Sequence, residues 1–433
     1  MWRSSHPFRG GRQTSFRGKN PSAPSARRDY AGVVTEAEVM TGTPPALLGG
    51  PVYLDYNATT PVDPRVTEAA LPYLLREFGN PSSSHAYGEA PHAAVEAARD
   101  QVLALLGAGS GGVVFTGSGS EADLLALRGS ILAPGAPRSH VVTQATEHPA
   151  VLATCAALRR HHGTRVTVLP VGADGILDPA ALEEVLRHPT SPEEAGERTV
   201  VSVMTANNET GALQPIEQLS DVAHAHGALL HSDAAQAAGK VPLDVGALGV
   251  DLLTVVGHKM YAPKGVAALY VRAGVALEPV VYGGGQEGGL RAGTENVALV
   301  AALGVAAALA AEDLAGGTAE RLAALRDTLQ AELERRLPGR VRLNGPASRR
   351  LPNTLNVSIG GVVAHDLLAA LPGLAASTGS ACHSGLHTPS PVLTAMGLDR
   401  ERALGAVRLS LGRWTTRDDV ALAVEQVVRA VRR

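Results

Sequence analysis

The stretch that decides the fold runs from Ala228 to Lys259 and reads ALLHSDAAQAAGKVPLDVGALGVDLLTVVGHK. It holds two short apolar runs, Ala228–His231 and Asp251–Val256, each followed at once by polar or small residues. Runs of this length that are rich in leucine and valine favour buried strands over helices. The chain between them is long enough for one crossover, so the two strands are predicted to be parallel neighbours in a sheet covered on both faces.

The same alternation of strand and helix extends outward from about residue 50 to about residue 310. Further strands are predicted at Val113–Phe115, His140–Thr143, Arg165–Val171, Thr199–Met204 and Gly265–Val271. Helices are predicted at Gly88–Leu106, Glu121–Gly129 and Pro215–His226. Such alternation indicates an α/β fold, with a mostly parallel sheet sandwiched by helices.

The pattern changes after residue 310, where a long helix over Ala311–Leu337 precedes mixed α and β segments. We therefore expect a disordered basic extension over residues 1–49, a large α/β domain over 50–310 and a smaller α+β domain over 311–433. Roughly the first 15 residues of the large domain are expected to pack on the small one.

Composition excludes several classes of protein. The 433 residues include only two cysteines, Cys155 and Cys382, too few for a disulfide scaffold or a structural zinc module. The net charge of -3 gives no basic field for nucleic acid. Only four lysines are present, and Lys240, Lys259 and Lys264 lie close together in the sequence. A lysine retained at a strand end in such a chain is conspicuous.

The first 28 residues contain seven basic residues, no acidic residue and no apolar run. A secretory signal needs an apolar core, so this composition excludes one. It fits a disordered tail, a start codon placed upstream of a better one at Met40, or an organellar transit peptide, and we expect a cytoplasmic protein. The longest uncharged apolar stretch, Val297–Ala311, is too short to cross a bilayer and predicts a buried core helix, so no membrane association is expected.

Polar residues follow five of the predicted strands, at the sheet edge where open α/β sheets bind ligands. These residues are Ser118 and Ser120, Glu147 and His148, Asn207 and Asn208, Asp233 and Gln236, and His258 and Lys259. The segment Gly117-Ser-Gly-Ser-Glu121 enters a helix, and its free N–H groups and hydroxyls could cradle an anion. An ordinary helix cap would give the same pattern.

Asp233 and Lys259 are separated by one strand–helix–strand crossover, so they can lie at neighbouring strand ends. A carboxylate beside a pyridinium nitrogen keeps that nitrogen protonated, and a nearby lysine can hold the same cofactor as a Schiff base. His148 could stack on a flat ring and handle protons. The alternatives are a helix cap for Asp233 and for His148, and a solvated loop lysine for Lys259.

Cys382 lies in Ser377-Thr-Gly-Ser-Ala-Cys-His-Ser-Gly-Leu386, a small-residue segment in which an accessible thiol could be a nucleophile. Cys155 lies on an apolar helix and is expected to be a small buried side chain. The histidines near either cysteine lack convincing ligand spacing, so no metal site is predicted.

Twelve stretches between residues 51 and 433 occur in the order found in one known family. They are Tyr53-Leu-Asp-Tyr-Asn-Ala-Thr-Thr-Pro61, Phe78-Gly-Asn-Pro-Ser-Ser83, Phe115-Thr-Gly-Ser-Gly-Ser-Glu121, Glu147-His148, Asn207-Asn-Glu-Thr-Gly211, Asp233-Ala-Ala-Gln236, Gly257-His-Lys-Met-Tyr261, Pro263-Lys-Gly265, Gly283-Gly-Gly-Gln286, Arg291-Ala-Gly-Thr-Glu-Asn296, Gly379-Ser-Ala-Cys382 and Ser410-Leu-Gly-Arg-Trp-Thr415. Through them the chain resembles the cysteine desulfurases and selenocysteine lyases of the class V aminotransferase group. The resemblance implies a homodimer with the pyridoxal-phosphate fold of type I, built on a seven-stranded sheet.

The resemblance also implies how pyridoxal 5'-phosphate is held. Lys259 would bind it covalently and move the substrate's Cα proton, Asp233 would pair with the ring nitrogen, and His148 would stack on the ring. The other residues implied in cofactor binding are Ser118, Gly119, Ser120, Asn208, Gln236 and His258, with Thr294 coming from a second subunit.

For the substrate, the resemblance implies that Arg413 grips the carboxylate of L-cysteine or L-selenocysteine, with Asn80 and Asn356 nearby. Cys382 would attack the substrate sulfur, keep it as a persulfide and pass it to an acceptor protein, for iron–sulfur clusters or thio-cofactors. The implied activity is that of a cysteine desulfurase, which yields L-alanine.

Two features depart from the desulfurase pattern. Val256 stands where desulfurases commonly have a serine near the phosphate, so one hydroxyl contact is absent. Cys382-His-Ser-Gly and the run Thr254–His258 are more similar to selenocysteine lyases. A selenocysteine lyase therefore stays open as an alternative, as does an aminotransferase that needs no cysteine.

Overall fold

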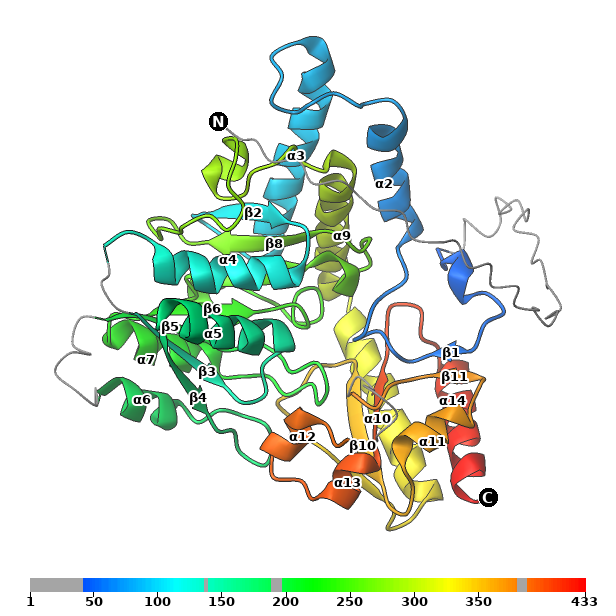
Figure 1. Ribbon diagram of the computed structural model, residues 1–433. Coiled ribbons are helices and arrows are strands. Elements are labelled where there is room, and N and C mark those ends of the chain that lie inside the picture. Colours follow the sequence, from blue (N-terminus) through cyan, green and yellow to red (C-terminus); the bar gives the residue numbers. More distant parts are fainter. Residues whose placement is uncertain (1–41, 136–138, 188–196, 380–387) are drawn as a thin grey trace, which may run out of the picture.

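The computed structural model describes residues 42–135, 139–187, 197–379 and 388–433. Its largest element is a seven-stranded sheet in the order β2-β8-β7-β6-β5-β3-β4 (Figure 1). The strands are β2 (Gly112–Thr116), β3 (Ser139–Gln144), β4 (Arg165–Leu169), β5 (Arg198–Ser202), β6 (Leu229–Asp233), β7 (Leu252–Val256) and β8 (Ala267–Val271). Only β8 runs antiparallel to its neighbours, so the predicted mostly parallel sheet is confirmed.

Helices cover both faces of this sheet. On one face lie α4 (Gly119–Leu132) and α5 (Pro149–His162); on the other lie α3 (Ala86–Leu105), α6 (Pro179–Arg187), α7 (Ile216–Ala225) and α9 (Val297–Ala315). Strand β7 shows why both faces need cover, because Leu252 packs under α4 while Leu253 and Val255 pack into the opposite core. Cys155 is 2% exposed within the α4–α5 side, as expected of a small core residue.

Helix α9 is the predicted core helix. By length and composition it could cross a membrane, but most of its side chains are buried against α2 (Pro64–Leu75), α3 and the sheet. It also continues past residue 310, where the sequence placed a domain boundary. The predicted single helix Ala311–Leu337 is wrong: α9 ends at Ala315 and α10 begins at Thr318, because Gly316 and Gly317 intervene and Gly317 takes φ +79°.

The smaller region is built on an antiparallel sheet in the order β12-β10-β9. Its elements are α10 (Thr318–Arg336), β9 (Val341–Leu343), β10 (Thr354–Ile359), α11 (Ala364–Ala369), α12 (Pro391–Ala395), α13 (Arg400–Leu404), β12 (Ala406–Ser410) and α14 (Arg417–Val431). A two-residue strand near the N-terminus, β1 (Val52–Tyr53), pairs in parallel with β11 (Leu374–Ala375). Val52 and Leu54 are thereby buried in the core of this C-terminal region.

The remaining elements are short: the helix α8 (Val245–Leu248) and the 3-10 turns η1 (Pro45–Leu47), η3 (Gly257–Lys259) and η4 (Gln286–Gly289). Turn η3 follows β7 directly and places Lys259 just beyond the end of that strand. Figure 1 shows the C-terminal region, yellow to red, beside the sheet, while α2 and the start of α3, in blue, project at the opposite end.

Candidate active site

A cavity of about 440 Å³ lies where the parallel strands end. Of the ten residues that the sequence assigned to cofactor binding, nine line it: Ser118, Gly119, Ser120, His148, Asn208, Asp233, Gln236, His258 and Lys259. These residues come from five separate strand ends, and the topology of the sheet brings them to one edge. The tenth, Thr294, is exposed and does not line this cavity.

The segment Ser118–Ser120 forms the N-terminal end of α4. The Ser118 hydroxyl caps the helix by accepting a hydrogen bond from the Glu121 N–H at 3.2 Å. A Cβ atom on Gly119 would lie 2.6 Å from Cγ2 of Val256, so only glycine lets the helix start this close to β7. The predicted cap and the predicted anion cradle are therefore compatible, because the cap uses one N–H and leaves the helix end facing the cavity.

Lys259 reaches the cavity from η3 and donates from Nζ to the carbonyl oxygens of Asn57 and Ala58, both at 2.7 Å. Burial and the positive charge of Arg408 lower its pKa to about 8, against the opposing charge of Asp233. A lysine with this pKa supplies a useful fraction of neutral amine near neutral pH, which a nucleophile or a base requires.

Asp233 ends β6, and its Oδ1 accepts from the Ala235 N–H at 2.8 Å. Burial raises the pKa of its carboxyl, although this hydrogen bond and the neighbouring His148 and Lys259 oppose the rise. His148 caps α5 through Nδ1, which accepts from the Ala150 N–H at 3.2 Å. Its pKa is lowered, mainly by burial, so the ring is neutral at ordinary pH.

Two more carboxyl groups, Asp123 and Glu147, are almost fully buried and lie close enough to Asp233 for its charge to raise their pKa. Burial, reinforced by the charge of Asp233, raises the pKa of Glu147 to about 8 and that of Asp123 well above its usual value. Within the described residues, Asp123 Oδ1 and Glu147 Oε2 have no hydrogen-bond partner. Asp123 and Asp233 line the cavity, whereas Glu147 does not. The wall that these two carboxyl groups form favours a ligand that carries positive charge or donates hydrogen bonds.

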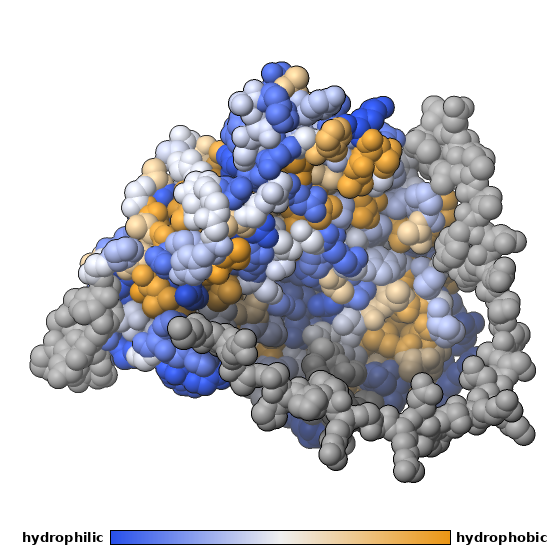
Figure 2. All heavy atoms as spheres, turned by 45° about the horizontal axis from the view of Figure 1, so that its top comes forward, coloured by the Kyte–Doolittle hydropathy of each residue, from blue (hydrophilic) through white to orange (hydrophobic). Residues whose placement is uncertain are grey.

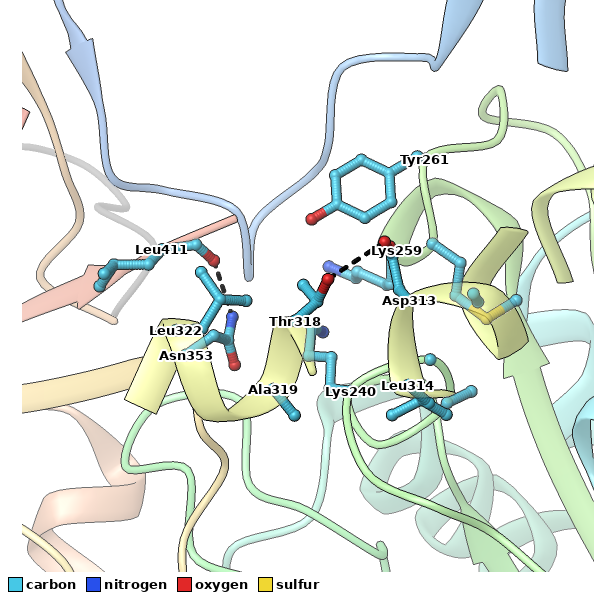
Figure 3. A pocket seen from close by; sticks show the side chains of 14 residues that line it. Lys240, Lys259, Tyr261, Asp313, Leu314, Thr318, Ala319, Leu322, Asn353 and Leu411 are labelled. Carbon is cyan, nitrogen blue, oxygen red and sulfur yellow. Dashed lines mark hydrogen bonds between the residues drawn. The ribbon is translucent and has the colours of Figure 1, made fainter. Parts of the chain in front are cut away.

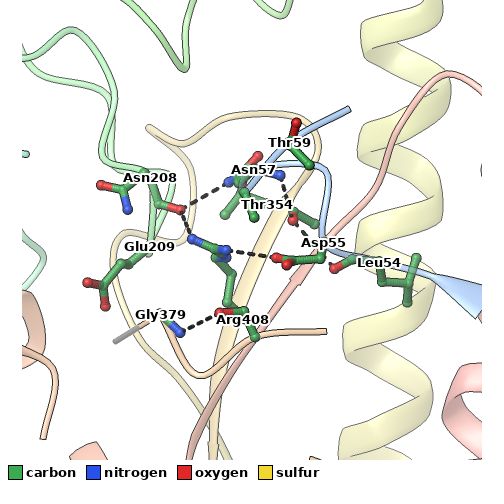
Figure 4. Close-up of polar contacts among 12 residues, drawn as sticks. Leu54, Asp55, Asn57, Thr59, Asn208, Glu209, Thr354, Gly379 and Arg408 are labelled. Carbon is green, nitrogen blue, oxygen red and sulfur yellow. Dashed lines mark hydrogen bonds and ion pairs between the residues drawn. The ribbon is translucent and has the colours of Figure 1, made fainter. Parts of the chain in front are cut away.

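Two residues missed by the sequence reasoning, Asn57 and Arg408, join the C-terminal region to the cavity (Figure 4). Arg408 donates to Asp55 Oδ1 at 2.7 Å and to the Asn208 carbonyl at 3.1 Å. Asn57 donates to the same Asn208 carbonyl at 3.1 Å and to Thr354 Oγ1 at 2.9 Å. For Arg408 a signal existed, because a charged residue inside the fully buried run Ala406–Ser410 must be held by partners.

Arg413, predicted to bind the substrate carboxylate, does not line the cavity. Its guanidinium group is bonded to Asp63 and to Asp313, and it stacks 4.2 Å above the ring of Tyr261. Asp63 caps the start of α2 and Asp313 lies in α9, so these two contacts tie the chain after β12 to both helices. Arg413 thus lies outside the cavity, and Arg408 is the arginine that the structure brings to it.

The remaining predicted residues lie elsewhere. Asn80 is exposed, and its Oδ1 accepts from the Ser82 N–H at 2.9 Å. Asn356 is fully buried and donates to the Glu209 carbonyl at 3.2 Å, outside the cavity lining. Neither side chain lines the cavity, and their predicted contact with substrate stays a prediction. Cys382 lies outside the described residues.

Residues on both sides of the segment that contains Cys382 are held near the cavity. Ser377 exchanges backbone hydrogen bonds with Arg408, with N–H to oxygen distances of 3.2 and 2.7 Å. Ser390 donates to the carboxylate of Glu209 at 2.6 Å. No cluster of three or more potential metal ligands occurs among the described residues.

With this geometry established, comparison with known proteins assigns the family. Residues 52–422 match the sequence profile of the class-V aminotransferases, and the chain belongs to that family.

Within the family, its relatives are cysteine desulfurases. The chain is 41% identical over 382 residues to "Cysteine desulfurase IscS" of Dictyoglomus turgidum, covering 88% of this chain and 94% of the relative. It is 42% identical to "Cysteine desulfurase, mitochondrial" of Drosophila melanogaster, covering 89% and 82%.

Solved structures agree with these relatives. A "NIFS-LIKE PROTEIN" superposes with a TM-score of 0.79 at 33% identity, covering 88% of this chain and 98% of the other. The structure "SspA in complex with cysteine" superposes with a TM-score of 0.71 at 33% identity, covering 84% and 99%. The fold predicted from the sequence is confirmed.

Proposed function

We propose that this protein is a pyridoxal-phosphate-dependent cysteine desulfurase, which converts L-cysteine to L-alanine and leaves the sulfur as a persulfide on Cys382. One observation carries the proposal: Lys259, whose pKa is lowered, and Asp233 line the same cavity. Ser118–Ser120, at the N-terminal end of α4, line it too. Relatives named as cysteine desulfurases support the choice of reaction.

The cavity fits the cofactor by the chemistry of its residues. Asp233, beside two further buried carboxyl groups, would stabilise a protonated ring nitrogen, and the end of α4 would hold the phosphate. Lys259 would form the covalent link, with His148 against the ring. When bound, pyridoxal phosphate supplies an electron sink for the pair of electrons left when the substrate's Cα–H bond breaks.

The residues of the chain would then divide the work. The neutral amine of Lys259 would take the Cα proton, which its pKa of about 8 allows near neutral pH. Arg408 has a guanidinium Nε without a hydrogen-bond partner among the described residues. We assign it the substrate carboxylate, in place of Arg413, because a guanidinium group binds carboxylates with two parallel hydrogen bonds.

Sulfur transfer would use Cys382 as a thiolate. Its sulfur forms a bond to the substrate sulfur, the Cβ–S bond breaks, and the electron pair stays with the carbon that becomes the methyl group of alanine after protonation. The persulfide sulfur then passes to the thiol of an acceptor protein, as iron–sulfur cluster assembly requires. The anchoring of Ser377 and Ser390 beside the cavity supports a role for the intervening segment.

A homodimer is part of this proposal. Four large apolar side chains near the start of α3 and the end of α2 are strongly exposed: Leu74 at 67%, Leu75 at 75%, Phe78 at 76% and Tyr87 at 65%. Figure 2 shows apolar side chains gathered near the projecting end formed by α2 and α3. A second copy of this chain would cover them and bring its Thr294 toward the cavity. Phe78→Glu should give monomers in light scattering, whereas an unchanged mass would contradict the dimer.

The deciding experiment is an alanine assay with L-cysteine and L-selenocysteine side by side. Wild-type protein should release alanine from cysteine, and Lys259→Ala should abolish release from both substrates. Cys382→Ala should abolish the cysteine reaction, whereas retained activity would favour an aminotransferase-type enzyme. Release from selenocysteine alone would favour a selenocysteine lyase, which the resemblance of Thr254–His258 leaves as the second candidate.

The expected cytoplasmic location, and organellar targeting by residues 1–28 as its alternative, concern a segment outside the described residues. Both stay predictions, as does the domain boundary at residue 310.

A further inference from the structure

Lys240 is a partly buried lysine that the proposed reaction does not use. It lies one helical turn beyond Gln236, in the segment that follows β6. Its Nζ donates to both oxygens of that residue, to the main-chain carbonyl at 3.1 Å and to the side-chain Oε1 at 2.9 Å. Both of these Lys240 hydrogen bonds therefore go to Gln236, which lines the cavity.

This contact fixes which way the Gln236 amide points. A glutamine can present either its oxygen or its NH2 group to a ligand, and the two ends differ little in shape. An ammonium group only donates, so the amide oxygen must face Lys240. Burial, with the charges of Lys259 and Arg408, lowers the pKa of Lys240 to about 7, yet even the neutral amine keeps two N–H bonds for these two oxygens.

The other end of the amide faces the active lysine. Gln236 Nε2 donates to the carbonyl oxygen of Asn57 at 2.9 Å, and Lys259 Nζ donates to the same oxygen at 2.7 Å. One N–H of the Gln236 NH2 group is used in this way. The second N–H is left for a ligand in the cavity that Gln236 lines.

Direct contact between Lys240 and a ligand is not needed for this effect. Figure 3 shows Lys240 and Lys259 on the wall of a separate small cavity, with Tyr261, Asp313 and Thr318. Its volume of about 20 Å³ suffices for roughly one water molecule. Lys240 does not line the larger cavity, so any influence on a ligand there passes through Gln236.

We propose that Lys240 is a positioning residue that holds the Gln236 amide with its NH2 group toward the cavity, so that Gln236 donates a hydrogen bond to the ring oxygen of bound pyridoxal phosphate. This inference rests on the proposed function. Without Lys240 only the Asn57 carbonyl still favours this orientation. An amide that turns over presents its oxygen to an oxygen anion, which costs a hydrogen bond and adds repulsion.

The test uses the holoenzyme of Lys240→Met, with cofactor affinity and the visible absorption band as readouts. Loss of a donor to a charged oxygen should raise the dissociation constant of pyridoxal phosphate about tenfold. It should also shift the absorption band of the bound cofactor. Lys240→Arg keeps a donor-only group and should restore the wild-type band. If Lys240→Met is poorly folded, Lys240→Gln replaces it, because an amide at this position can also accept.

A double-mutant cycle with Gln236→Ala separates positioning from a general loss of charge or packing. In the Gln236→Ala background, Lys240→Met should change neither readout further. Unchanged affinity and band in the single variant, or equal changes in both backgrounds, would overturn the inference. Failure of the wild-type protein to bind the cofactor would instead overturn the proposed function.

Discussion

Arg408 and Arg413 lie on the same short stretch of chain, and both side chains are at most 10% exposed. Arg408 lines the large cavity, is paired with one carboxylate, and has an unpaired Nε among the described residues. Arg413 is enclosed by two carboxylates and the rings of Tyr261 and Trp414. Similar burial thus conceals a difference in place and partners: Arg408 borders the cavity with one carboxylate partner, whereas Arg413 lies outside it and joins elements of the fold through two.

The largest expected effect is on catalysis, from Arg408→Met. If Arg408 binds the substrate carboxylate, its removal should lower kcat/KM for L-cysteine about 1,000-fold, equivalent to about 4 kcal/mol. Steady-state kinetics would measure this, with the cofactor's absorption showing that the cavity remains loaded. Arg413→Met is the matched variant. If the folded fraction of Arg413→Met loses as much kcat/KM as Arg408→Met, the two arginines do not differ in their roles.

The next effect is on stability, from Arg413→Met. Asp63 is 1% exposed on its side chain, so removing its buried partner should cost about 3 kcal/mol of unfolding free energy. Although burial raises the pKa of Asp63, hydrogen bonds from Arg65 and the charge of Arg413 keep it below its ordinary value. In Arg413→Met the buried Asp63 keeps only the exposed Arg65 as a charged partner, so adding Asp63→Asn should recover part of the loss. Denaturant unfolding would measure both, and equal stability of wild type and Arg413→Met would refute the structural role.

The smallest effect concerns pH. Lys259 has a pKa of about 8, below its usual value through burial first and the charge of Arg408 second. Its reactive neutral form therefore increases as pH rises, so capture of pyridoxal phosphate by the apo protein should accelerate from pH 6 and level off above a midpoint near pH 8.

Arg408→Met removes one of the charges that favour neutral Lys259, so it should move this midpoint upward by about one pH unit. Arg413→Met should leave it unchanged. Stopped-flow absorbance would give the midpoints, and identical values for Arg408→Met and wild type would show that this charge does not reach Lys259.

Most of the cavity could be predicted because strand ends are visible in the sequence. Asp233 and Lys259 follow apolar runs directly, and parallel strands bring such positions to one edge. Asn57 gave no such signal, since it lies in an irregular segment after β1 and reaches the cavity only through long-range packing with β10 and the turn after β5.

The place of Arg413 outside the cavity was hidden from the sequence for a similar reason. Its position after Gly412 says nothing about Asp63 and Asp313, which come from segments far away in the sequence. The two arginines differ in their partners. Tertiary contacts determine those partners, and neither the periodicity of the sequence nor the spacing of its motifs predicts such contacts. The break at Gly316 and Gly317 is different, because a pair of glycines inside a helical pattern is itself a signal in the sequence that a helix ends.

The pairing of β1 with β11 has a consequence for biosynthesis. Val52 and Leu54 leave the ribosome early, but their burial needs Leu374 and the strands that follow it. Until the last elements emerge, these apolar residues have no permanent partner, while the seven-stranded sheet is already complete at Val271. Strand β1 can therefore pair only after Leu374 has been synthesised. A chain that ends before Leu374 leaves Val52 and Leu54 without the partners that bury them, so we expect chaperones or proteases to recognise it.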